Sequence, residues 1–232
     1  MTSVLEKTIS VIAPHRCIVC SNYDNVVCTA CVYGVCRLEA PFCLLCSKET
    51  AKWQPCRACV PNTTLTMAQA ATMYDGTIKE LVHRFKFDHA RAAYKPLATL
   101  IATSLPSFSA EWVVVPVPTV AAHIRTRGYD HALLIAKEVA RQKGISLQTV
   151  LRRARDHRQV GANRAERHRQ ARDVFEVRRA FTAKKVLLID DVCTTGATLS
   201  AAAAVLTAAG AVEVWGAVAA WQQPKLHKKK DR

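Results

Sequence analysis

The sequence contains few acidic residues and few aromatic ones. Its 18 aspartates and glutamates are outnumbered by 33 lysines and arginines, which gives a formal net charge of +15 at pH 7, and aromatic residues make up 6% of the 232 positions. The shortage of acid predicts affinity for polyanions: nucleic acid, phosphorylated metabolites or anionic membrane surfaces. Charge alone does not choose among them, and a merely soluble basic surface is the alternative.

Uninterrupted hydrophobic runs are also missing. The first fourteen residues include Glu6 and Lys7 and lack a long apolar stretch ending in a small-residue cleavage site, so we expect no signal peptide. The most apolar region, residues 201–221, is long enough to cross a bilayer, but two glycines and Glu213 interrupt it. We therefore expect a helix, a glycine stop and a strand there, no transmembrane span, and a cytoplasmic location.

Cysteine is abundant in one segment only. Nine of the ten cysteines lie between Cys17 and Cys59, eight of them in C-x-x-C pairs, a spacing typical of metal ligands rather than of a secreted disulfide scaffold. Two such pairs complete a tetrahedral site of four thiolates with no open position, which predicts structural zinc that supplies folding free energy. One or two ions fit, most simply with the first pair joined to the second and the third to the fourth, although crossed pairing and iron stay open. The predicted ligands are Cys17, Cys20, Cys28, Cys31, Cys43, Cys46, Cys56 and Cys59.

From residue 67 onward the pattern changes to alternating helices and strands. We expect helices over 76–87, 92–103, 129–143 and 198–208, and strands over 111–118, 174–177, 185–189 and 212–220. Such alternation is typical of an α/β fold with a parallel sheet flanked by helices on both faces. We divide the chain into a small N-terminal zinc-binding module (residues 1–60), an α/β domain (67–222) and a basic tail (223–232) that we expect to be disordered.

The most informative stretch is VLLIDDVCTTGATL, residues 186–199. Its apolar start predicts a central strand ending in Asp190 and Asp191, and ligands bind at that end of an open α/β sheet. The turn that follows offers clustered N–H groups, hydroxyl donors and one residue without a Cβ, which predicts a phosphate cradle at a helix N-terminus. The cradle residues are Thr194, Thr195, Gly196, Ala197 and Thr198.

The two carboxylates would repel a phosphate unless they bind something else. They suit the vicinal hydroxyls of a sugar or a hydrated Mg²⁺, so phosphate and diol together describe a ribose 5-phosphate. A Walker A loop is excluded because no Gly-Lys-Ser/Thr follows. An ordinary helix capped by two aspartates is the competing interpretation.

A second loop follows the strand predicted over 111–118. The run Pro116-Val117-Pro118 constrains the backbone, and Arg125 and Arg127 are predicted to reach the oxygens of a leaving diphosphate. A surface turn with solvated arginines is the alternative.

A basic strip lies between Arg152 and Lys185, where twelve lysines and arginines accompany four acids. Three interpretations stay open: a hood that closes over substrate and excludes water, a solvated basic helix, or a strip that contacts single-stranded DNA. Aromatic residues are nearly absent here, so any DNA contact is expected to be to phosphates rather than bases. The residues predicted for that contact are Arg152, Arg153, Arg155 and Arg158.

Residues 186–199 resemble the signature that binds phosphoribosyl pyrophosphate (PRPP) in type I phosphoribosyltransferases. Before this signature the chain carries, in order, the cysteine pairs, Lys86-Phe87, the VPVP strand end and the Arg-Gly-aromatic turn. In this ordered combination the chain resembles the ComF family over residues 17–221. The resemblance implies a type I phosphoribosyltransferase-like fold, with Asp190 and Asp191 on the ribose hydroxyls, the cradle on the 5-phosphate, and magnesium bound with PRPP. Where many members carry Asn-Gln after the turn, this chain has Asp130-His131.

The same resemblance implies a role in natural competence, in handling single-stranded DNA taken up during transformation. Three hypotheses follow: a transferase that moves phosphoribose to an unidentified acceptor, a non-catalytic PRPP sensor, or a DNA-uptake adaptor that contacts other competence proteins. No residue is a convincing general base, and His131 and His157 are candidates by location only.

Overall fold

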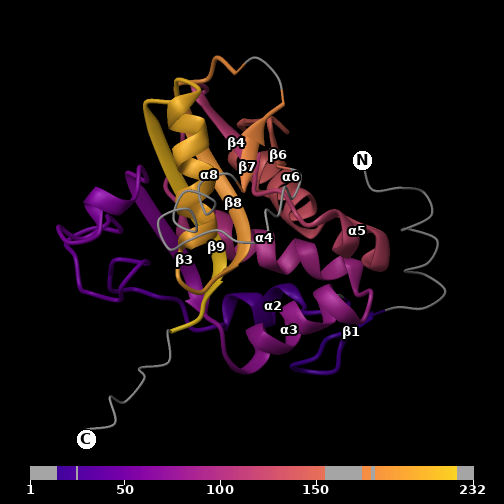
Figure 1. Ribbon diagram of the computed structural model, residues 1–232. Coiled ribbons are helices and arrows are strands. Elements are labelled where there is room, and N and C mark those ends of the chain that lie inside the picture. Colours follow the sequence, from indigo (N-terminus) through magenta and orange to yellow (C-terminus); the bar gives the residue numbers. More distant parts are fainter. Residues whose placement is uncertain (1–14, 25, 155–173, 179–180, 224–232) are drawn as a thin grey trace, which may run out of the picture.

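A computed structural model describes residues 15–24, 26–154, 174–178 and 181–223 (Figure 1). Its centre is a five-stranded sheet in the order β3-β9-β8-β4-β5, with every neighbouring pair parallel. The predicted parallel α/β sheet is therefore confirmed. The strands are β3 (Met67–Met73), β4 (Trp112–Pro116), β5 (Ser146–Leu147), β8 (Lys185–Cys193) and β9 (Glu213–Trp221).

Both faces of the sheet are covered, and each face has its own hydrophobic core. On one face lie α3 (Gly76–Phe87), α4 (Tyr94–Ser104) and α6 (His131–Lys143). The short helix η2 (Arg91–Ala93) leads into α4, and α5 (Ala121–Arg127) precedes α6 in the chain. On the other lie α8 (Ala197–Ala208) and a hairpin of β6 (Leu151–Arg153) and β7 (Phe175–Val177). The continuous apolar runs in β4 and β8 follow from this burial on both sides.

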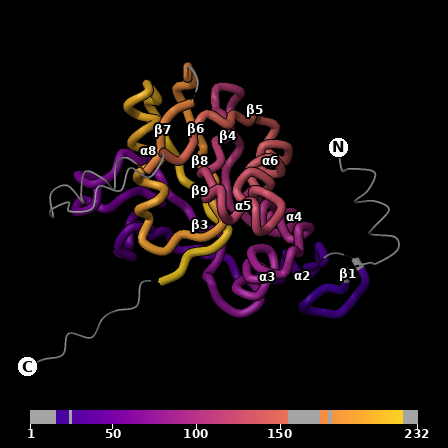
Figure 2. Tube along the Cα trace, turned by 45° about the vertical axis from the view of Figure 1, so that its right-hand side comes forward, coloured from indigo at the N-terminus to yellow at the C-terminus, as the bar shows by residue number. Residues whose placement is uncertain are grey.

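The cysteine-bearing segment divides between the two faces. Its first part, with β1 (His15–Arg16), β2 (Tyr23–Asp24) and α2 (Thr29–Tyr33), packs beside α4 and joins the core that contains α3 and α6 (Figures 1 and 2). Its second part, which ends in the short helix η1 (Val60–Asn62), joins the core under α8 through Leu44 and Phe42. The two halves therefore support opposite sides of one sheet.

Strand β3 and helix α5 are the two longest of the elements that were not predicted. Strand β3 has the sequence MAQAATM, whose small residues give no strand signal by themselves; parallel pairing with β9 from Met67↔Trp215 to Met73↔Trp221 makes it an edge strand. Helix α5 occupies residues expected to form a loop, and it ends at Gly128, whose φ of 77° is left-handed. Among the described residues, no helix is both long and apolar enough to cross a membrane.

Candidate functional site

Strand β4 ends beside Ile189 of β8, and β8 continues through Asp190 and Asp191 to Cys193, four residues beyond the strand end predicted from the sequence. Pro116 is in register with Ile189, and Val117 N–H donates to the Ile189 carbonyl at 2.9 Å. A cavity of about 330 Å³ opens at this edge of the sheet. Its lining comes from four parts of the chain and includes Lys86, Phe87, Val117, Pro118, Thr119, Arg127, His131, Arg153, Asp190, Asp191 and Thr198.

Asp191 lies at the bottom of this cavity in an ion pair. Its side chain is 4% exposed, and Oδ2 lies 2.7 Å from Lys86 Nζ, which extends from the last turn of α3. Oδ1 accepts a hydrogen bond from Val192 N–H at 2.7 Å. A buried charge requires such a partner. One of the two predicted sugar-binding carboxylates is therefore already held by the protein, although it still faces the cavity.

Asp190 has a different environment. Its Oδ1 accepts a hydrogen bond from the Asp191 N–H at 2.9 Å, and no described lysine or arginine forms an ion pair with it. Burial, reinforced by the negative charge of Asp191, raises the pKa of Asp190 to about 7. Near neutral pH both the charged and the neutral form of this carboxyl are therefore populated, and because no described cation is paired with it, it is the acid better placed to bind a ligand hydroxyl.

His131 connects Asp191 to Arg127. Arg127 Nη1 lies 3.0 Å from His131 Nδ1, and His131 Nε2 lies 3.4 Å from Asp191 Oδ2. Because a guanidinium only donates, Nδ1 must accept, which assigns the ring proton of the neutral imidazole to Nε2, on the side of Asp191. Burial lowers the pKa of His131, which favours this neutral form. His131 is thus occupied in positioning its neighbours and is a poor general base.

The turn predicted to bind phosphate (residues 194–198, called the phosphate turn below) begins where β8 ends at Cys193. Thr194 and Thr195 are exposed, and Gly196, at φ 71°, caps the N-terminus of α8. Ala197 N–H donates to Thr195 Oγ1 over a long 3.4 Å, a bond that a phosphate oxygen can replace. The first turn of a helix carries N–H groups without intrahelical partners, so the local geometry agrees with a phosphate cradle. Burial raises the pKa of the Cys193 thiol to about 12, so that side chain is packed and unreactive.

Of the two arginines predicted to bind diphosphate, Arg125 and Arg127, the structure places only one at the cavity. Both lie in the last turn of α5, but only Arg127 lines the cavity, and Arg125 is exposed. Residues two positions apart on a helix point to nearly opposite sides, so both cannot face one ligand. The unusual Asp130 has a structural role: it caps α6 by accepting from Leu133 N–H at 3.1 Å and from Thr119 Oγ1 at 2.8 Å.

Of the four arginines predicted to contact DNA, Arg155 and Arg158 lie outside the described residues, as does His157. Arg152 forms an ion pair with Glu176 across the hairpin at 2.7 Å. Arg153 donates from Nε to the Pro118 carbonyl at 3.0 Å and stacks on Phe175 at 5.1 Å. Since Arg153 also lines the cavity, its guanidinium lies where it can contact a ligand there.

Sequence reasoning missed Lys86 and Thr119 as parts of the site. Lys86 follows three helical turns of buried apolar residues and carries no motif of its own beyond the Lys-Phe pair. With Arg127 and Arg153 it gives the cavity three cationic side chains against two acids, which favours an anionic ligand.

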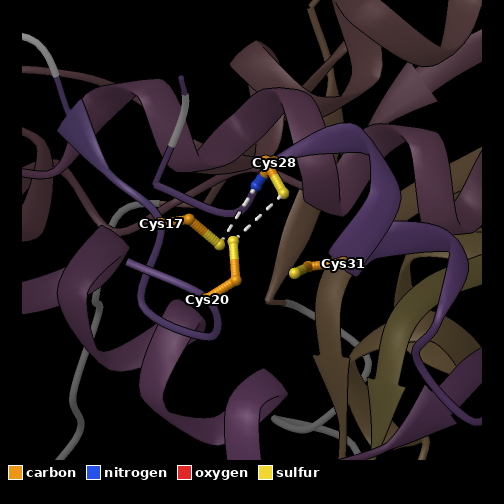
Figure 3. Close-up of side chains that lie close together, drawn as sticks. All are labelled: Cys17, Cys20, Cys28 and Cys31. Carbon is orange, nitrogen blue, oxygen red and sulfur yellow. Dashed lines mark hydrogen bonds between the residues drawn. The ribbon is translucent and has the colours of Figure 1, made fainter. Parts of the chain in front are cut away.

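The eight paired cysteines form two clusters. In the first cluster, Cys17, Cys20, Cys28 and Cys31 point toward a common centre (Figure 3). In the second, the sulfurs of Cys43, Cys46, Cys56 and Cys59 also lie close together. Within each cluster the sulfurs lie within 4.8 Å of one another, with Sγ–Sγ distances of 3.7 Å for Cys20–Cys28 and 3.4 Å for Cys46–Cys56. Tetrahedral zinc with Zn–S bonds near 2.3 Å requires ~3.8 Å between sulfurs. Both clusters fit zinc, and the simplest pairing is the one observed.

His131, Asp190 and Asp191 also bring ligand atoms within 4.8 Å. Lys86 already neutralises Asp191, so a resident cation is disfavoured here. The magnesium ion expected to accompany PRPP stays a prediction.

Three curated relatives match most of the chain. Competence protein ComFC of Streptococcus pneumoniae is 25% identical over 195 residues, covering 83% of this chain and 86% of its own length. Competence protein F of Haemophilus influenzae is 26% identical over 220 residues (87% and 95%), and Competence protein ComFC of Bacillus subtilis is 26% identical over 199 residues (81% and 80%).

The family described as Phosphoribosyl transferase domain matches residues 130–232. A solved structure titled "Structure of the allosteric regulatory enzyme of purine biosynthesis" aligns with a TM-score of 0.40 and 22% identity, over 54% of this chain and 25% of its own. A TM-score of that size does not establish a common fold. The chain is therefore similar over most of its length to the competence proteins ComFC and F, and its residues 130–232 match the phosphoribosyl transferase domain.

Proposed function

We propose that this protein binds PRPP, or a related sugar phosphate, in the cavity beside the end of β4 and the C-terminal half of β8, and that it acts in natural competence. The observation that carries the first part is the meeting of Asp190, Thr198 and Arg127 around one cavity of about 330 Å³. The names of the three relatives support the second part.

Each part of the ligand has a complementary group. The 5-phosphate lies on the turn from Thr194 to Thr198, where helix N–H groups and hydroxyls donate to it. The ribose hydroxyls face Asp190, and the diphosphate faces the cationic side chains of Lys86, Arg127 and Arg153. Magnesium, when bound with the diphosphate, offsets its negative charge. The protein's own cations set the orientation of the sugar between the two phosphate sites.

In the transferase form of the proposal, the bond from the anomeric carbon to the diphosphate breaks, and the diphosphate leaves with the electron pair. A lone pair of the acceptor forms the new bond to that carbon. A second cavity of about 290 Å³, which shares Lys86, Phe87 and Arg127 with the first, supports this form because it offers space for a second reactant. A PRPP sensor would need no such space.

Calorimetry with PRPP and Mg²⁺ tests the binding proposal. We expect binding by the unmodified protein, about tenfold or more weaker binding for Asp190→Asn, and none detectable for Asp190→Ala combined with Asp191→Ala. Exposed Asp75→Asn is the matched control, with unchanged affinity. Unchanged affinity in the double variant, with the fold intact by circular dichroism, contradicts the proposal. Release of diphosphate with candidate acceptors then separates transferase from sensor.

A second candidate function, single-stranded DNA binding, is favoured by the net charge of +15 and by the basic strip. Affinity for a single-stranded oligonucleotide should fall steeply with salt, and neutralising Arg152, Arg155 and Arg158 should lower the salt slope by about two. Affinity that does not change with salt would contradict phosphate contacts.

A further inference from the structure

The second cysteine cluster touches the phosphate turn directly. Gly196 is the residue of that turn with a left-handed φ, and the side chain of Leu45 packs against its Cα. A Cβ at Gly196 would overlap Leu45 Cδ2 and lie 3.8 Å from Leu45 Cα. Leu45 stands between Cys43 and Cys46, two of the clustered cysteines. The absence of a side chain at Gly196 thus admits both the backbone conformation and the close approach of Leu45.

The contact belongs to a wider packed surface. Leu44 is 2% exposed and shares a core with Cys193 and Leu199, which stand just before and just after the turn. Phe42 packs on Trp221 with ring centroids 4.5 Å apart, and Trp221 is the strand partner of Cys193. Both ends of the turn are therefore held by residues of the second cysteine segment.

A polar contact reinforces the first turn of α8 from the same side. Thr63, four residues after the last cysteine of the cluster, donates from Oγ1 to Ser200 Oγ at 3.0 Å. Ser200 N–H in turn donates to the Gly196 carbonyl at 2.9 Å. The chain leaving the cluster is thus linked to the helix whose N-terminus forms the cradle.

The backbone around Leu45 depends on the cluster for its shape. Ser47 adopts a left-handed φ of 67° and donates from N–H to the Cys43 carbonyl at 2.8 Å, and Cys43 N–H donates to the Lys48 carbonyl at 2.8 Å. These few hydrogen bonds close the loop. We expect that Leu45 keeps its contact with Gly196 only while the four thiolates of the cluster are held by one metal ion. Small metal-held loops of this kind gain most of their order from the metal.

We propose that the metal of the second cluster holds the phosphate turn in its binding conformation, with Leu45 as the positioning residue. The inference rests on the proposed function only in taking the turn as the phosphate site. Leu45 contacts no ligand: it acts through Gly196 by restricting the turn to the conformation in which its N–H groups converge.

The first cluster provides an internal control. Val19 occupies the same place between Cys17 and Cys20 that Leu45 occupies between Cys43 and Cys46, but Val19 is 51% exposed. Its cluster packs with the core on the opposite face of the sheet. Truncating Val19 therefore removes the equivalent side chain without touching the turn.

The test compares Leu45→Ala, Leu45→Met and Val19→Ala, each loaded with zinc. Hydrogen exchange of the amides of residues 194–199 is measured without ligand, with β4 amides as the reference for global unfolding. We expect about tenfold faster exchange at the turn in Leu45→Ala, unchanged exchange in β4, rescue by the similar volume of methionine, and no effect of Val19→Ala. Ribose 5-phosphate affinity should fall by a similar factor in Leu45→Ala alone.

Equal exchange at the turn in Leu45→Ala and Val19→Ala overturns the proposal, as does a turn that stays protected after Cys46→Ser has emptied the second cluster. Because exchange is measured without ligand, a failure of PRPP to bind any variant counts against the proposed function and leaves this readout intact.

Discussion

The two cysteine clusters have nearly the same ligand spacing but support different parts of the molecule. The first packs through Val27 and Val32 into the core beneath α3 and α4, on the face of the sheet that supplies Lys86 and His131 to the site. The second packs through Leu44 and Leu45 against the phosphate turn and α8, on the opposite face. A C-x-x-C pattern therefore predicts the ligand set, whereas the residues between the cysteines determine which part of the fold each cluster contacts.

The largest effect is expected from removing one metal at a time. Cys28→Ser and Cys56→Ser should each lower the zinc content from two ions per chain to one and lower Tm markedly, because each cluster organises a segment with little core of its own. Only Cys56→Ser should also weaken sugar-phosphate binding at temperatures where both variants stay folded. Elemental analysis and calorimetry check this. Equal losses of affinity in the two variants would contradict the claim that only the second cluster supports the phosphate turn.

The next effect concerns the contribution of the first face to the site. Lys86→Met leaves the buried Asp191 carboxylate without its ion-pair partner, and we expect a loss of about 3 kcal/mol of unfolding free energy. Urea denaturation measures it, and exposed Lys79→Met on the same helix is the control, with a change below ~0.5 kcal/mol. A loss in Lys86→Met no larger than in the control would show that the pair contributes nothing to stability.

Gly196→Ala tests the contact between the second cluster and the turn on the other face of the sheet. Alanine at φ 71° costs ~1 kcal/mol by itself, and its methyl group also overlaps Leu45, so we expect a total of about 2–3 kcal/mol. Gly144→Ala, at φ 67° with open space around it, should show the conformational part alone.

Leu45→Ala should then restore part of the stability lost in Gly196→Ala. The double variant should therefore lose less unfolding free energy than the two single variants lose together, and a double-mutant cycle in urea detects this coupling. Strict additivity would mean that the two residues do not meet.

The smallest effect is expected at the hairpin beside α8. Arg152→Ala removes an ion pair whose side chains are 52% and 42% exposed, so stability should change by less than ~1 kcal/mol. If the hairpin contacts DNA, the same change lowers oligonucleotide affinity at low salt, measured by fluorescence anisotropy. A stability loss above that limit would show that the pair is structural.

Short-range patterns predicted much of this protein. The apolar run before Asp190 predicted β8, the Thr-Gly turn predicted the N-terminus of α8, and the cysteine spacing predicted both ligand sets. In each case the chemistry resides in residues that are neighbours in sequence, so no knowledge of the tertiary structure was needed.

What escaped prediction depends on residues far apart in sequence. The Lys86–Asp191 pair joins positions more than a hundred residues apart, and Leu45 meets Gly196 only because the second cluster packs beneath α8. Strand β3 is specified by its partner β9 rather than by its own small residues. Arg125 was grouped with Arg127 because a loop was expected there, whereas helix α5 points them apart.

The central claim is that the Asp190 carboxylate, in the C-terminal half of β8, binds a sugar diol while the turn after the strand binds the phosphate. Calorimetric titration with ribose 5-phosphate and with 2-deoxyribose 5-phosphate, in the unmodified protein and in Asp190→Asn, tests it most directly. We expect the unmodified protein to prefer the ribose form by about tenfold or more and Asp190→Asn to lose most of that preference. Equal affinity for the two sugars in the unmodified protein would contradict the claim.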